Sequence, residues 1–195
     1  MRMRIQVTEN VYRPAEDSFL IADQIPYYRS WRTLDLGTGS GILALVSAEN
    51  AQEVVASDIN PHAADCSKKN AELNGLDHKV DILVGDLFDP IRAEKRFDLI
   101  TFNPPYLPEP KHGAQRDHLD SSWNGGSNGR QVIDRFLSQF PRFLNRDGTA
   151  LLVQSSLSGI QSTISKLRRE RFSVKIVASK HIQFEDIVVL SCQKT

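Results

Sequence analysis

The sequence predicts an α/β fold: a seven-stranded, mostly parallel sheet with helices on both faces and an antiparallel closing strand. Strand-like and helix-like segments alternate along the chain, which is typical of parallel strands joined through helices. Glycine-rich or acidic motifs follow the early strand-like runs, and the last two runs follow one another as a hairpin-like pair. A chain of 195 residues suits one such domain, which we expect to span residues 1–195.

Seven short apolar runs are expected to form the strands. They span residues 33–37, 53–58, 79–84, 97–102, 149–154, 172–178 and 187–192. The pair Asp147-Gly148 provides a turn before the fifth strand.

Helices are expected between most of these strands, and several of their ends carry recognisable signals. Pro14 lies at the start of a helix that continues towards residue 25, with an acidic first turn. Asn60 caps another helix, which has Pro61 in its first turn and Gly75 as its stop. Two further helices are expected over residues 41–49 and 159–169.

Residues 129–144 form the most clearly amphipathic of the predicted helices. Its apolar face consists of Val132, Ile133, Phe136, Leu137 and Phe140. Pro141 is expected to kink or end this helix. The preceding stretch, residues 107–128, is the long irregular part of the sequence. Because loops of about 20 residues are rare in compact domains unless they serve a site, we expect it near the substrate.

The composition excludes several classes of protein. Lysine plus arginine and aspartate plus glutamate both number 24, so the net charge is zero, which argues against a broad nucleic-acid-binding face. Cys66 and Cys192 lie far apart without metal-ligand spacing, so we expect no metal site and a reduced, cytoplasmic protein. The amino-terminal MRMRIQV lacks the apolar run of a signal peptide, and no stretch has the roughly 18 apolar residues of a membrane span.

The motif DLGTGSG, residues 35–41, follows the first strand and is expected to approach a ligand closely. Its Gly-x-Gly-x-Gly spacing differs from the Gly-x-Gly-x-x-Gly of dinucleotide sites. Asp35 suits a cationic amine such as that of S-adenosylmethionine. Asp58 ends the second strand, 21 residues after Gly37, where an acid can accept both ribose hydroxyls. Asp86 follows the third strand, where it can accept from an adenine amine; a plain turn or helix-capping aspartate is the alternative.

The motif FNPPYLP, residues 102–108, follows the fourth strand. An Asn-Pro pair often starts a turn, but this one can also hold a planar nitrogen group. The side-chain carbonyl of Asn103 and the backbone carbonyl of Pro104 can accept both N–H hydrogens of an amide or adenine amine. Pro105 stiffens the segment, and Tyr106 can stack on the planar group. We therefore predict an acceptor clamp that needs no strong general base.

These motifs resemble those of class I, Rossmann-like, S-adenosylmethionine-dependent methyltransferases. With VYRPAEDSFLIADQI at residues 11–25 and WNGGSNGRQVIDRFL at residues 123–137, the chain resembles the HemK-type glutamine methyltransferases, in their short archaeal and eukaryotic branch. The resemblance extends from residue 11 to about residue 190. Asn124 departs from it, since a small residue is expected after that tryptophan.

The resemblance implies a function, a partner and a set of site residues. The acceptor would be the glutamine of a Gly-Gly-Gln motif in a translation termination (release) factor, and a small zinc-binding activator would cover an apolar edge of the chain. The segment 1–30 would close the cofactor site. The implied S-adenosylmethionine contacts are Ser18, Asp35, Gly37, Gly39, Asp58, Asp86, Leu87 and Asn103. Asn103 and Tyr106 would hold the acceptor, with Pro104 and Pro105 shaping the pocket.

Other functions stay open at the level of sequence. The same clamp could hold an adenine amine of DNA or RNA, although neutral charge and the lack of a target-recognition domain disfavour this. A lysine acceptor is not planar and must first lose a proton, so it suits the clamp less well. The hypothesis of a nicotinamide oxidoreductase lacks support, because the third glycine of the Gly-x-Gly-x-x-Gly motif is missing. A non-catalytic cofactor-binding subunit would not need Asn103.

Overall fold

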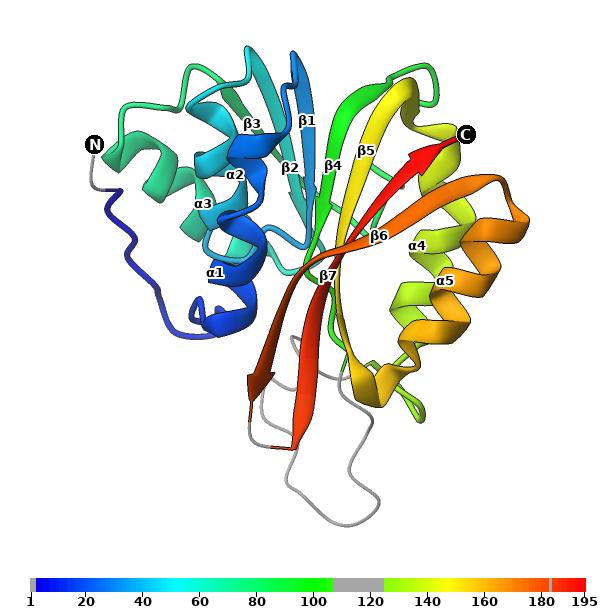
Figure 1. Cartoon of the computed structure of the whole chain (residues 1–195). Helices are drawn as coiled ribbons and strands as arrows, with labels where there is room; N and C mark the ends of the chain where they lie inside the picture. The colour runs from blue at the N-terminus through cyan, green and yellow to red at the C-terminus, as the bar shows by residue number, and fades with distance from the viewer. Residues whose placement is uncertain (1–2, 107–124, 183) are drawn as a thin grey trace.

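The computed structural model describes residues 3–106, 125–182 and 184–195, which form a seven-stranded mixed sheet (Figure 1). The strand order is β3-β2-β1-β4-β5-β7-β6. The strands are β1 (Arg32–Leu36), β2 (Glu53–Asp58), β3 (Val80–Val84), β4 (Phe97–Phe102), β5 (Leu144–Ser155), β6 (Phe172–Ile182) and β7 (Glu185–Lys194). The first five pair in parallel, whereas β7 is antiparallel to both β5 and β6. The predicted fold class is therefore confirmed.

Helices cover both faces of this sheet (Figure 1). They are α1 (Glu16–Ala22), α2 (Ile42–Ala48), α3 (Pro61–Leu73), α4 (Gln131–Gln139) and α5 (Ile160–Arg169). Successive residues of β4 show the two layers: Leu99 packs in the cluster that contains α1 and α2 residues, and Ile100 packs with α4 and α5. Side chains that alternate in this way bury both faces of the central strands. None of the helices in the described ranges is long and apolar enough to cross a membrane.

The strands β5, β6 and β7 are longer than predicted, for identifiable reasons. Strand β5 begins at Leu144, ahead of the expected turn at Asp147-Gly148, because Leu144 already pairs with Phe97 before an irregularity in the register. The β6–β7 hairpin continues past residue 178, because polar residues such as Lys180 keep pairing through their backbones where the apolar pattern has ended.

Other boundary predictions are confirmed. The helix expected over residues 129–144 is shorter, but Pro141 ends it as predicted: α4 spans Gln131–Gln139, and Pro141 lies in the short 3-10 helix η3 (Phe140–Arg142). Asn60 caps α3 by accepting from the backbone N–H of His62 at 3.0 Å. Most of the expected loop, residues 107–124, lies outside the described residues.

A cluster of aromatic rings links the core to the carboxyl end of β4. Phe136 of α4 is buried, and its ring centroid lies 4.9 Å from those of Phe102 and Phe140 and 6.0 Å from that of Phe88. Phe102 is the first residue of the motif that contains Asn103. The position of that motif therefore depends on how these rings pack.

Replacing Phe136 with alanine should lower the free energy of unfolding by about 3–5 kcal/mol, because it removes a ring from a close-packed core and leaves a cavity. Urea unfolding followed by circular dichroism measures this change. Ser138→Ala, at an exposed position of the same helix, should stay within about 0.5 kcal/mol of the parent. A loss below about 1 kcal/mol in Phe136→Ala would show that the rings do not form a supporting core.

Candidate active site

A cavity of about 640 Å³ lies at the carboxyl ends of the parallel strands. This is the edge at which open α/β sheets bind ligands, and the volume suits a small molecule. The predicted site residues that line it are Ser18, Gly37, Gly39, Asp58, Asp86, Leu87, Asn103, Pro104, Pro105 and Tyr106. The remaining predicted site residue, Asp35, does not line the cavity. Segments far apart in the sequence thus converge on one site.

The glycine motif forms the tight turn between β1 and α2. Gly37 and Gly41 have φ values of +61° and +85°, in the left-handed region that favours glycine. A Cβ on Gly41 would lie 2.5 Å from Oγ of Ser67 in α3. The loop therefore packs against α3 on one side and presents backbone without side chains on the other.

Asp58 holds this loop at the end of β2. Its Oδ2 accepts from the N–H of Gly39 and its Oδ1 from the N–H of Asn60, both at 2.9 Å. Burial raises the pKa of Asp58, while these two N–H donors act in the opposite direction. Ile59 follows, lines the cavity and is 65% exposed, so an apolar surface flanks the carboxylate.

Asp35 departs from its predicted direct contact with the ligand, because it is fully buried beneath the glycine loop. Its carboxylate accepts from the hydroxyls of Thr38 at 2.7 Å and Thr101 at 2.8 Å, and from the backbone N–H of Ala44 in α2. Asp35 lies one residue before the end of β1, so its side chain points into a face of the sheet. Asp35 therefore supports the loop from behind.

Asp86 and Leu87 form the wall that follows β3. Asp86 makes an ion pair with Arg135 of α4, whose Nη2 lies 2.7 Å from Asp86 Oδ2. Arg135 also lines the cavity, and the sequence offered no signal for it beyond its place in an amphipathic helix. Leu87 is buried with a φ of +48°.

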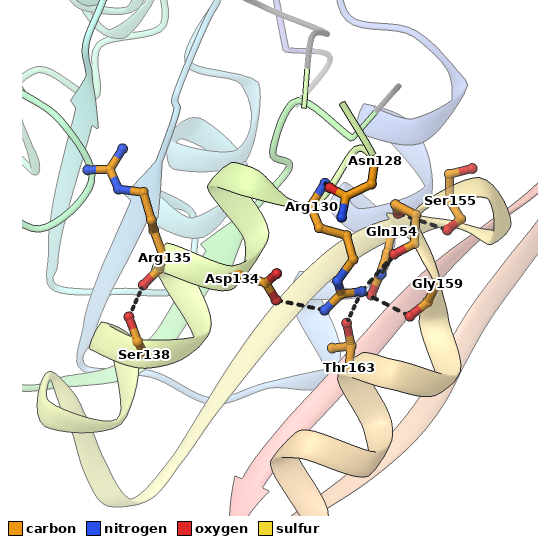
Figure 2. A network of polar contacts seen from close by, with 10 residues as sticks. Asn128, Arg130, Asp134, Arg135, Ser138, Gln154, Ser155, Gly159 and Thr163 are labelled. Atoms are coloured by element: carbon orange, nitrogen blue, oxygen red, sulfur yellow. Dashed lines mark hydrogen bonds and ion pairs between the residues drawn. The ribbon is translucent and has the colours of Figure 1, made fainter. Parts of the chain in front are cut away.

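Helix α4 is held at its start by Arg130, as Figure 2 shows. The Arg130 guanidinium donates to the carbonyls of Ser158 and Gly159 at 2.7 and 3.0 Å and to the hydroxyl of Thr163 at 3.1 Å. In the same view Arg135 points away from this network. The turn before α5 thus fixes the helix that brings Arg135 to Asp86.

Asn103 is joined to α1 through its amide nitrogen. Its Nδ2 donates to Oδ2 of Asp17 at 3.1 Å and to Oγ of Ser18 at 3.4 Å. Its Oδ1 is buried and has no hydrogen-bond partner in the part of the chain that the structure describes. A buried amide oxygen without a partner lacks a hydrogen bond that an N–H group of a ligand could supply.

Tyr106 lies beside Asn103, and its hydroxyl donates to Asp17 Oδ2 at 3.2 Å. Burial, and then the charge of Asp17, raise the pKa of Tyr106, so the phenol stays protonated. Sequence reasoning interpreted Asp17 only as an acid in the first turn of a helix. The structure shows that Asp17 joins α1 to the acceptor motif.

The cavity fits S-adenosylmethionine in several respects. The glycine loop leaves room for a ligand against its backbone, Asp58 presents a fixed carboxylate, and Ile59 and Leu87 offer apolar surface for a base. In the described ranges no cluster of three histidine, cysteine, aspartate or glutamate side chains could hold a metal ion. The seven-stranded sheet and this site together define a methyltransferase of the α/β class.

Comparisons with known proteins agree with this class. The methyltransferase small domain family matches residues 14–118. A Methanocaldococcus jannaschii protein named as a protein N5-glutamine methyltransferase is 34% identical over 97% of this chain and 94% of its own length. The eRF1 methyltransferase catalytic subunit mtq2 of Schizosaccharomyces pombe is 28% identical over 97% of this chain and 91% of its own. The chain therefore belongs to the HemK-type protein glutamine methyltransferases, within the methyltransferase small domain family.

The fold is also that of a solved methyltransferase complex. The structure of the E. cuniculi Mtq2–Trm112 complex, responsible for methylation of the eRF1 termination factor, aligns with a TM-score of 0.76. The alignment covers 95% of this chain and 99% of that one at 23% identity, so it supports the fold alone.

The buried Asp35 gives the stability of this protein a predictable pH dependence. Burial raises the pKa of Asp35 to about 7, against an ordinary value of 3.8, so the folded state favours the protonated acid. That contribution to stability is complete below pH 3.8 and is lost as the pH rises through about 7. Asp35→Asn should remove this loss, so its unfolding free energy should vary less between pH 4 and 7 than that of the parent.

Urea unfolding at each pH tests this prediction, with Asp98→Asn as a control of opposite sign. Backbone and Asn145 donors lower the pKa of Asp98 despite its partial burial, so the stability that Asp98 contributes is lost as the pH falls. Parallel pH profiles for Asp35→Asn and the parent would contradict the assignment.

Proposed function

We propose that this methyltransferase transfers the methyl group of S-adenosylmethionine to the side-chain amide of the glutamine in the Gly-Gly-Gln motif of a translation termination factor. The observation that carries the proposal is the buried, unpaired Oδ1 of Asn103 in the cavity wall, next to Pro104. The names of the relatives, which specify protein glutamine and eRF1 as acceptors, support it.

The proposed clamp compensates for the poor reactivity of an amide nitrogen. The lone pair of that nitrogen is delocalised into the carbonyl group, so it must be oriented and its developing positive charge stabilised. Asn103 Oδ1 and the Pro104 carbonyl would accept its two N–H hydrogens, and the Tyr106 ring would lie against the amide plane. When bound, S-adenosylmethionine supplies the electrophilic methyl group. Neither Tyr106 nor Tyr12 can act as a base, since burial and then Asp17 raise the pKa of both.

The cofactor would lie between the glycine loop and the amino-terminal segment. Asp58 would accept from the ribose hydroxyls and Asp86 from the adenine amine, with Ser18, Gly37, Gly39, Leu87 and Asn103 as further contacts. Tyr12 and Pro14 also line the cavity, which supports the proposal that the segment 1–30 closes the site. Asp35 would act indirectly, through Thr38 and the loop.

We further propose that a small zinc-binding subunit covers the β3 edge of the sheet. Strand β3 is an outer strand, its Ile82 and Leu83 are only half-buried, and Val84 is 55% exposed. An exposed apolar edge strand is a template for pairing with another chain. The opposite edge, β6, carries exposed Lys175 and Lys180, which discourage such pairing.

The function is tested with labelled S-adenosylmethionine and the termination factor, intact or with the Gly-Gly-Gln glutamine replaced by alanine. Label should enter the intact factor alone. Asn103→Ala should still bind the cofactor through the remaining contacts yet lose at least about 100-fold in transfer, because it removes a clamp acceptor. Full activity in Asn103→Ala would refute the clamp. Label in neither factor, despite cofactor binding, would point to nucleic acid or another protein acceptor.

The β3 edge is tested by co-purification with the candidate zinc-binding subunit. Val84→Lys should weaken the complex at least about tenfold, because a charge would enter an apolar interface. Ile176→Lys on β6, where the parent side chain is 51% exposed, is the matched control and should leave the complex intact. Equal effects of the two changes would rule out this edge as the docking surface.

A further inference from the structure

We infer that Asp17 fixes which end of the Asn103 amide faces the acceptor, and so makes the site select a carboxamide over a carboxylate. This inference rests on the proposed function, because it concerns the acceptor pocket of that same site. Asp17 acts through Asn103 and Tyr106, and is therefore a positioning residue. Its place in the first turn of α1 brings its side chain against the segment that follows β4.

Asp17 is 5% exposed, and every polar contact of its carboxylate is with a donor. Oδ1 accepts from the backbone N–H of Ser18 at 2.6 Å, and the Tyr12 hydroxyl lies 3.3 and 3.4 Å from the two oxygens. Oδ2 accepts from Asn103 Nδ2 at 3.1 Å and from the Tyr106 hydroxyl at 3.2 Å. Such surroundings suit an ionised carboxylate, which has no hydrogen to donate.

The carboxylate determines the orientation of the Asn103 amide. The two ends of an amide have nearly the same shape, and Ser18 Oγ could pair with either, by accepting from the NH₂ or by donating to the oxygen. Asp17 Oδ2 can only accept, so the NH₂ end must face α1. The Asn103 oxygen is thereby kept for the other side, where it is buried and unpaired among the described residues.

The same carboxylate also turns the hydroxyl hydrogen of Tyr106 away from the acceptor. Both donors that the clamp could offer, the Asn103 NH₂ and the Tyr106 O–H, are therefore directed to Asp17. What remains for the substrate is a set of acceptors. A glutamine NH₂ can satisfy them, whereas a glutamate of almost the same shape has no hydrogen for them and would be repelled.

Asp17→Asn should reverse this arrangement without changing the shape of the side chain. The backbone N–H of Ser18 still requires an oxygen at the Oδ1 position, so the new NH₂ must occupy the Oδ2 position. That NH₂ then faces Asn103, whose oxygen should turn towards it. The flipped amide presents its NH₂ to the acceptor pocket, which suits a carboxylate. Glu16→Gln is the matched control, because Glu16 is the neighbouring acid of the same helical turn and pairs with Lys180 at the surface.

The first measurement compares the parent, Asp17→Asn and Glu16→Gln for transfer to the intact factor and for competitive inhibition by a factor carrying glutamate in place of the Gly-Gly-Gln glutamine. Asp17→Asn should lose about 100-fold in kcat/KM for glutamine and bind the glutamate factor at least about tenfold more tightly than the parent does. Its cofactor affinity should stay within about threefold of the parent, and Glu16→Gln should match the parent throughout. An unchanged preference for glutamine in Asp17→Asn would overturn the inference.

The second measurement needs no acceptor, so it separates this inference from the proposed function. Hydrogen exchange of the Asn103 side-chain NH₂, assigned by its absence in Asn103→Ala, should be slow in the parent and in Glu16→Gln. It should be at least about tenfold faster in Asp17→Asn, where the NH₂ has lost its carboxylate acceptor. If the parent fails to methylate the factor but shows this pattern, the proposed acceptor is wrong and the positioning role stands. Fast exchange in the parent would overturn the positioning role whatever the acceptor.

Discussion

The parallel alignment of β1, β2, β3 and β4 is the constraint on which the site depends. Parallel strands end at one edge of a sheet, so the segments that follow them must meet there, however far apart they lie in the sequence. The glycine loop, Asp58, the wall after β3 and the Asn103 segment come together for this reason. The sheet itself brings these segments together, so suitable residues at each strand end are enough to build one cavity.

The strand ends would still be loose without a second layer of buried polar groups behind them. Asp35 binds Thr38 in the loop and Thr101 in β4, and so joins two neighbouring strands beneath the cavity floor. Asn70 of α3 plays a similar part, because its Nδ2 donates to the carbonyls of Gln6 and Ser40 at 2.7 and 2.9 Å. Each amide or carboxylate satisfies backbone or hydroxyl groups that burial would otherwise leave unpaired. The amino-terminal segment is thereby attached to the same support as the glycine loop.

Features of the structure that depend on local sequence pattern could be predicted. Features that depend on contacts between residues far apart in the sequence could not. The sequence of strands and helices along the chain and the end of α4 just before Pro141 follow from apolar periodicity and helix-ending signals. The extension of the β6–β7 hairpin depends on backbone pairing across polar residues, which periodicity does not report. Asp35 was expected to face the ligand, but its side chain is buried beneath the glycine loop. The direction of that side chain depends on the residue at which β1 ends, which the sequence pattern does not define closely enough.

Asp17 was the most consequential residue that sequence reasoning missed. Its partners Asn103 and Tyr106 lie 86 and 89 residues further along the chain, so nothing in its own neighbourhood distinguishes it from any acid in a first helical turn. The segment around it was part of the family resemblance, but a resemblance does not say what a side chain touches. Arg135 and Ile59 were missed for the same reason, since exposed helix and loop residues of these types are common.

The charges around the cavity suggest why this site would favour the substrate form of the proposed cofactor. Asp17 and Asp58 both line the cavity, while Arg135, the guanidinium among the lining residues, is paired with Asp86. The local field is therefore negative and favours a cationic sulfonium ligand over the neutral thioether that remains after methyl transfer. The particular part that Asp17 plays is carried by its hydrogen bonds to Asn103 and Tyr106, which set the polarity of the amide in the acceptor segment. The site therefore needs a group there that only accepts hydrogen bonds, and not merely a side chain of the same size.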